Sequence, residues 1–97
     1  DTLRKKYTEL FADVTEQGAA HFLPEFIIIS AGFDTYKKDP IGGLNLELED
    51  FRTLTEIVMK TAERRCHGRV VSCLEGGYHL TDLPFCIEAH LKALLRR

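Results

Sequence analysis

Two short glycine-containing segments of the chain carry side chains that could do chemistry. The first, SAGFD at residues 30–34, ends in the carboxylate of Asp34, and the second, EGGY at residues 75–78, ends in the phenol of Tyr78. A carboxylate presented by the end of a strand suits a hard or borderline cation, or a basic group. A phenol can donate a hydrogen bond to a developing oxyanion. Asp34 is therefore a candidate metal ligand and Tyr78 a candidate catalytic donor.

Each of these residues also has a structural interpretation. A single Asp after a strand is most often a turn or helix cap. Gly76 and Gly77 allow a sharp turn and close approach of a ligand, but they are equally typical of a strand-ending turn with Tyr78 packed on the surface. A dinucleotide site is not indicated, because three spaced glycines opening a helix are missing. The histidines show no HxxxH or HExxH spacing, and His79 is the one that could reach this site.

The elements that position these segments follow from the hydrophobic pattern. Helical spacing predicts a first helix that stops at Gly18, a second from about Glu49 that ends at Gly68, and a third over residues 83–94 with Thr81 as its cap. Apolar, β-branched runs at 26–30 and 69–74 predict strands buried on both faces, and residues 34–45 predict a loop. The expected order is helix, strand, helix, strand, helix, which is an α/β fold.

A strand, helix, strand sequence at this spacing forms a right-handed crossover, so the two strands should be parallel. Asp34 and Tyr78 then leave the same edge of the sheet, where ligands bind in open parallel sheets. Two parallel strands alone would leave two hydrogen-bonding edges open. We therefore expect further strands, on sequence beyond this chain or on a partner.

The composition of the chain excludes some classes of protein. The chain has 97 residues with 13 Lys and Arg against 15 Asp and Glu, a net charge of −2, which argues against a polycationic nucleic-acid binder. We expect a single unit over residues 1–97, and the longest apolar run is too short to span a membrane. Three cysteines without CxxC spacing indicate reduced thiols and an intracellular protein, cytoplasmic, or nuclear if the source is eukaryotic. Because the chain begins inside an expected helix without Met, we expect a segment of a longer domain.

Four motifs together resemble the C-terminal part of the histone deacetylase superfamily. They are SAGFD (30–34), DPIGGL (39–44), GRVV (68–71) and LEGGY (74–78), in the family's order and spacing. The similarity is strongest to the class II-like and bacterial branch, which includes acetylpolyamine amidohydrolases. The resemblance implies the C-terminal portion of an arginase/deacetylase-like three-layer fold with a mostly parallel sheet.

The same resemblance implies a zinc cofactor and hydrolysis of the amide of an acetylated lysine or an acetylpolyamine. It places one of three zinc ligands on Asp34 and the oxyanion-stabilising tyrosine on Tyr78. Gly76 and Gly77 would line the substrate tunnel, and Ile41 would form an apolar wall of it. The family's other two zinc ligands, on a DxH motif, and its His pair are not among these residues. The segment alone is therefore expected to be inactive and to need the remainder of the domain.

Smaller departures from the family pattern are Tyr36, where His is frequent, and Glu47, where a Thr cap is frequent. A second hypothesis is a non-catalytic remnant that binds a partner through its open sheet edge. Upstream sequence encoding the His pair and the DxH motif would separate the two. Nucleotide binding by a Rossmann-like half is a third, weaker alternative.

Overall fold

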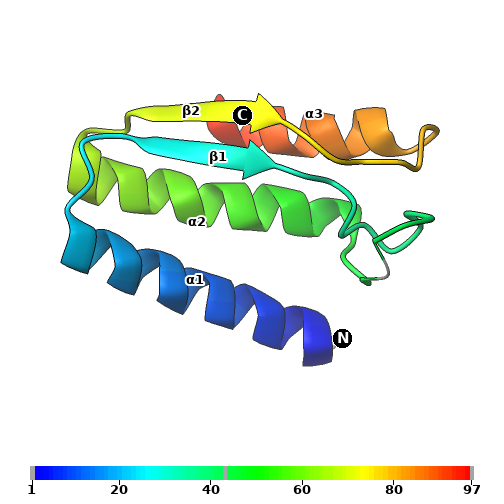
Figure 1. Ribbon diagram of the computed structural model, residues 1–97, viewed down its shortest axis with the longest axis horizontal. Helices are drawn as coiled ribbons and strands as arrows, with labels where there is room; N and C mark the ends of the chain where they lie inside the picture. Colours follow the sequence, from blue (N-terminus) through cyan, green and yellow to red (C-terminus); the bar gives the residue numbers. More distant parts are fainter. Residues whose placement is uncertain (1, 43, 97) are drawn as a thin grey trace.

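The chain forms its elements in the order that the sequence predicts. The computed structural model describes residues 2–42 and 44–96, so Gly43 of the DPIGGL motif lies outside the described part. The elements are α1 (Thr2–Phe22), β1 (Ile27–Ala31), α2 (Leu48–Cys66), β2 (Val70–Leu74) and α3 (Leu83–Leu94). Figure 1 shows β1 and β2 side by side, with α2 running along them and α1 beyond α2. None of the described helices is long and apolar enough to cross a membrane.

The two strands pair in parallel, which confirms the predicted parallel pairing. The register joins Ile27 to Val70 and Ala31 to Leu74. The ladder continues past both strands, since the Glu75 N–H donates to the Ala31 carbonyl at 2.9 Å and the Phe33 N–H donates to the Gly76 carbonyl at 2.8 Å. The two glycine-containing segments therefore leave the sheet side by side.

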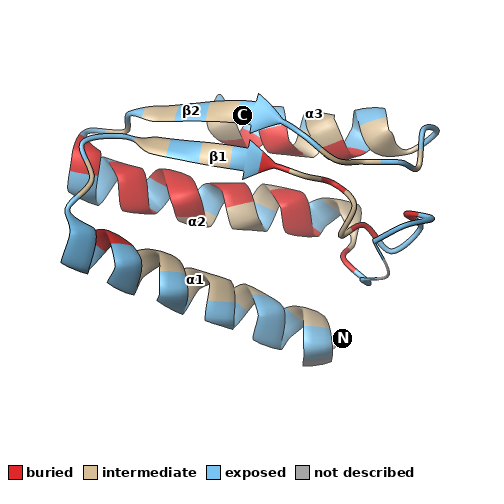
Figure 2. Ribbon diagram, viewed as in Figure 1, coloured by how far each residue is buried: buried red, intermediate tan, exposed pale blue. Residues whose placement is uncertain are grey.

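Only one face of the sheet is covered, so the prediction that both strands are buried on both faces is wrong for the described chain. Burial alternates along β1, and Figure 2 shows pale blue exposed residues interrupting both strands. Ile28 is 62% exposed and Val71 is 51% exposed on the outward face. The cause is that α2 and α3 supply apolar cover on a single side, where Ile29 and Ala31 pack into the core.

The core lies where the end of β1 meets the first turns of α2 and one face of α3. The rings of Phe33 and Phe51 meet edge to face with centroids 5.1 Å apart. The buried cluster consists of Ala31, Phe33, Tyr36, Leu46, Phe51 and Cys86. Tyr36 belongs to the predicted loop and Leu46 directly follows it, and the Lys37 N–H donates to the Leu46 carbonyl at 2.8 Å. The loop is thus anchored in the core at both ends.

Several helix ends differ from the prediction. Helix α1 continues through Gly18 to Phe22, because one helical glycine costs only about 1 kcal/mol relative to Ala. The helix stops instead where Leu23 turns left-handed, at φ 57°, before Pro24. Helix α3 has Asp82 rather than Thr81 at its N-cap.

Helix α2 ends close to the predicted residue. Its last residue is Cys66, and His67, at φ 60°, and Gly68, at φ 73°, both take left-handed conformations. Left-handed residues cannot continue a right-handed helix, so α2 ends before His67. Gly68 adopts the left-handed conformation without strain.

Candidate functional site

Asp34 lies three residues beyond β1, with its carboxylate between two glycines. A β-carbon built on Gly76 would lie 3.1 Å from Oδ2 of Asp34, and one built on Gly32 would lie 3.1 Å from Oδ1. The carboxylate is half-buried, and no described residue gives it a hydrogen bond or an ion pair. Both oxygens are therefore available to an external ligand.

Tyr78 follows the carboxyl end of β2, which lies beside the carboxyl end of β1, as the parallel pairing predicts. Its side chain is 47% exposed, so the phenol faces outward rather than into the core. Its backbone N–H donates to Oδ2 of Asp39 at 2.7 Å. The turn before Tyr78 carries Gly76, which contacts Asp34, and this places the carboxylate and the tyrosine segment next to each other.

Asp39 is a site residue that sequence reasoning missed. Its buried carboxylate accepts backbone N–H groups from Ile41 at 2.8 Å and Gly42 at 2.9 Å on Oδ1, and from Tyr78 on Oδ2. In the sequence, Asp39 stands out only as part of the predicted loop and of the DPIGGL motif, without a role of its own. An Asx turn could have indicated the two local contacts, but no sequence signal indicates the bond to Tyr78.

The electrostatics of Asp39 follow from these bonds. Burial alone would raise the pKa of the carboxyl, but the backbone N–H groups of Gly42, Ile41 and Tyr78 outweigh it and lower the pKa. Asp39 is therefore ionised at neutral pH and is an acceptor on both oxygens.

Gly77 and Ile41, two of the expected tunnel residues, have different surroundings in the structure. Gly77 has φ 147°, a region that favours glycine, and a β-carbon there would lie 2.6 Å from Leu83 Cδ1. Ile41 is 70% exposed. Packing therefore explains both glycines of the motif, whereas tunnel lining by Ile41, Gly76 and Gly77 stays a prediction.

A partly buried polar cluster lies at the start of α3, beside the Tyr78 segment. The Tyr36 hydroxyl donates to Oδ2 of Asp82 at 2.6 Å, which raises the pKa of Tyr36 to about 12 and lowers that of Asp82. His79 accepts the Asp82 backbone N–H on Nδ1 at 3.3 Å. His79 thus lies against the start of α3. In a separate contact, Glu75 accepts a hydrogen bond from the Ser30 hydroxyl at 2.9 Å.

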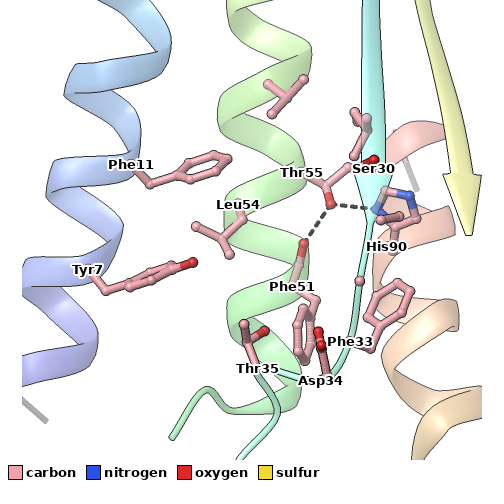
Figure 3. A pocket seen from close by; sticks show the side chains of 14 residues that line it. Tyr7, Phe11, Ser30, Phe33, Asp34, Thr35, Phe51, Leu54, Thr55 and His90 are labelled. Carbon is pink, nitrogen blue, oxygen red and sulfur yellow. Dashed lines mark hydrogen bonds between the residues drawn. The ribbon is translucent and has the colours of Figure 1, made fainter. Parts of the chain in front are cut away.

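A cavity between the helices and β1 meets this edge at Asp34. It measures about 310 Å³ and lies between α1, α2 and β1, with Tyr7, Phe11 and Leu54 in its lining. Figure 3 shows Asp34 and Thr35 at one end of it and His90 farther along. Tyr78 and Ile41 do not line it. The cavity therefore reaches the carboxylate segment at Asp34 but does not reach Tyr78.

The residues present fit one ligand of a metal ion but not a whole site. Within residues 2–42 and 44–96 there is no cluster of three or more His, Cys, Asp or Glu side chains that could hold a metal. Catalytic zinc takes three protein ligands and keeps an open position. The carboxylate of Asp34 has the donor chemistry and the free oxygens for one of them.

The parallel crossover, with a free carboxylate and a phenol beyond its strand ends, defines a segment of an α/β ligand-binding domain. The comparisons identify which domain. The family model described as histone deacetylase domain matches residues 1–94. The chain therefore belongs to the histone deacetylase domain family.

Individual relatives agree with this family. A type-2 histone deacetylase 2 of Dictyostelium discoideum is 43% identical over 76% of this chain and 4% of its own length. A histone deacetylase-like amidohydrolase of Pseudomonas aeruginosa is 34% identical over 91% of this chain and 23% of its own length. The crystal structure of the HDA15 HD domain superposes with a TM-score of 0.81 at 33% identity, covering 97% of this chain and 26% of that chain. The chain thus spans about a quarter or less of each of these three proteins, and the fold is that of part of a deacetylase domain.

Proposed function

We propose that this chain is the part of a zinc-dependent deacetylase domain that supplies one zinc ligand, Asp34, and the oxyanion-stabilising residue, Tyr78. The substrate is an acetylated lysine side chain of a protein or an acetylpolyamine. The observation that carries the proposal is a carboxylate with no hydrogen-bond or ion-pair partner among the described residues, next to a tyrosine that follows the neighbouring parallel strand. Family membership supports an amide hydrolase as the activity.

The chain's own residues have distinct tasks in this proposal. Zinc, when bound, supplies Lewis-acid activation of the amide carbonyl and of the attacking water. Asp34 offers a carboxylate oxygen to the metal. Tyr78 donates its phenolic hydrogen to the acetyl oxygen, and this hydrogen bond strengthens as negative charge develops there. Ile41, Gly76 and Gly77 border the acyl chain.

The remainder of the domain is the first partner that the proposal requires. Ile28 and Val71 are exposed on the outward sheet face, and Ile41 and Tyr78 are exposed at the proposed site. These surfaces are apolar, and burying them against further polypeptide is favourable. The proton acceptor and the other zinc ligands would come from that polypeptide, so the segment alone would be inactive.

Neither nucleic acid nor a membrane is part of the proposal. The net charge of −2 supports this, because it offers no excess of cations for phosphates. An intracellular location, cytoplasmic or nuclear, is supported by the free thiols of Cys66, Cys73 and Cys86.

A partner-binding remnant is the second candidate, and the uncovered sheet face favours it. The two candidates are separated by intact mass, zinc content and turnover of a fluorogenic acetyl-lysine peptide, measured on the purified protein that carries this chain. A mass well above 11.1 kDa with stoichiometric zinc and turnover supports the deacetylase. A mass of 11.1 kDa without zinc or turnover contradicts it and favours the remnant.

A further inference from the structure

We propose that Asp39 is a positioning residue that sets the location of Tyr78 and Ile41 relative to Asp34. The inference rests on the function proposed above and deepens it. Asp39 touches neither the substrate nor the metal in this proposal. It acts through backbone N–H groups of two separate segments, the turn at residues 39–42 and the segment that ends in Tyr78.

The two oxygens of Asp39 serve different segments. Oδ1 accepts the N–H groups of Ile41 and Gly42, which closes the local turn and orients Ile41 outward. Oδ2 accepts the N–H of Tyr78 at 2.7 Å, across 39 residues of sequence. A single side chain therefore fixes the distance between the proposed wall residue and the proposed oxyanion donor.

The turn that Asp39 closes is also packed against the backbone of Asp34. A β-carbon built on Gly42 would lie 1.5 Å from the Asp34 carbonyl oxygen. Only glycine permits this approach, so the Asp39 turn lies in direct contact with the Asp34 backbone and cannot move closer to it without displacing Asp34. The carboxylate of Asp39 thus links the tyrosine segment to the residue that would hold the metal.

The geometry needs a carboxylate rather than another polar group. Asp39 is 8% exposed and has donors on both oxygens, so each oxygen must act as an acceptor. An asparagine of the same shape has one acceptor oxygen and an NH₂ group, which would face an N–H donor on the other side. The substitution Asp39→Asn therefore breaks one side of the link with almost no change of volume.

The test compares Asp39→Asn with Asp50→Asn in the full-length protein that carries this chain. Asp50 is a matched control, because it is 7% exposed and accepts the Glu47 N–H and the Arg4 guanidinium at the start of α2. Displacing the tyrosine should lower kcat of Asp39→Asn by about 10- to 100-fold with little change in KM. Equal kcat values for the two variants would overturn the proposal.

A double-mutant cycle separates positioning from loss of stability. If Asp39 acts through Tyr78, then Asp39→Asn should cost much less activity in a Tyr78→Phe background than in the unaltered protein. A purely structural role predicts the same fold-loss in both backgrounds. Additive losses would therefore overturn the proposal.

Hydrogen exchange of the unaltered protein tests the link without relying on activity or on a variant that must fold. The Tyr78 amide should be protected from exchange, because its N–H is bonded to a buried carboxylate. Exchange at the rate of an open loop would overturn the link. Protection without any turnover of an acetyl-lysine peptide would support the link and contradict the proposed function instead, so the two failures are distinguishable.

Discussion

The carboxylate of Asp34 occupies the space beside Gly76 that a side chain on that glycine would need. A β-carbon at this position would lie 3.1 Å from Cγ and Oδ2 of Asp34. The contact arises because the backbone ladder continues past the strands, where the Phe33 N–H donates to the Gly76 carbonyl. The glycine motif and the carboxylate motif are thus complementary parts of one arrangement.

The first prediction concerns this contact. Gly76→Ala should shift the Asp34 carboxylate by a few tenths of an ångström and lower both zinc affinity and turnover. Metal analysis and a peptide deacetylation assay on the full-length protein would measure this. Gly18→Ala is the control, since nothing lies within 4 Å of that position in α1. It should raise the free energy of unfolding by up to about 1 kcal/mol and leave activity unchanged.

Removing the hydroxyl of Tyr78 tests the proposed oxyanion donor. Tyr78→Phe should raise the barrier by about 2 to 4 kcal/mol, the usual effect of losing one such donor. Zinc content should stay the same, because the phenol holds no ligand position in the proposal. Turnover that matches the unaltered protein would show that Tyr78 has another role.

Removing the carboxylate of Asp34 tests the proposed metal ligand. Asp34→Ala should abolish stoichiometric zinc, measured by metal analysis after dialysis. Asp13→Ala is a matched control, because Asp13 is an exposed carboxylate on α1 whose one hydrogen-bond donor among the described residues is Gln17. The assignment of Asp34 fails if its variant retains as much zinc as the Asp13 variant.

Stability should depend on pH through His90. The ring is 6% exposed, with Nδ1 2.7 Å from the Thr55 hydroxyl and Nε2 2.8 Å from the Ser72 hydroxyl. Burial lowers the pKa of His90 in the folded state. Below about pH 6.5 the His90 ring takes up a proton more readily in the unfolded chain than in the folded chain. The free energy of unfolding should therefore decrease as the pH is lowered.

Urea unfolding between pH 5 and 8 would measure this slope. His90→Gln should flatten it, whereas His21→Gln, at an exposed position on α1, should not. A slope that survives in the His90 variant would contradict the assignment. A separate loss, below about pH 4, is expected from Asp39, Asp50 and Asp82, whose pKa values are lowered in the folded state.

Much of the fold was predictable because it depends on local pattern. Periodic apolar residues and β-branched runs indicated all five elements in order, and the strand, helix, strand order indicated parallel pairing. The shared edge of Asp34 and Tyr78 follows from that pairing alone. These features follow from local sequence patterns and from the preferred handedness of strand crossovers.

Other features depended on contacts between distant residues. The sequence does not show that Gly18 stays helical, because the small cost of a glycine is outweighed by the rest of the helix. It does not show which strand face is covered, because Ile28 and Ile29 are chemically the same and differ only in which side the helices occupy.

The motifs and hydrophobic pattern of the sequence by themselves determined the class of domain and the order of its elements, and they supplied the candidate site residues. The tertiary structure alone decided how those residues are held. The bond from Asp39 to the Tyr78 N–H joins groups 39 residues apart, and the backbone donor has no signature in the sequence. Any residue but proline carries such an N–H, so only the folded path of the chain decides which one a buried carboxylate meets.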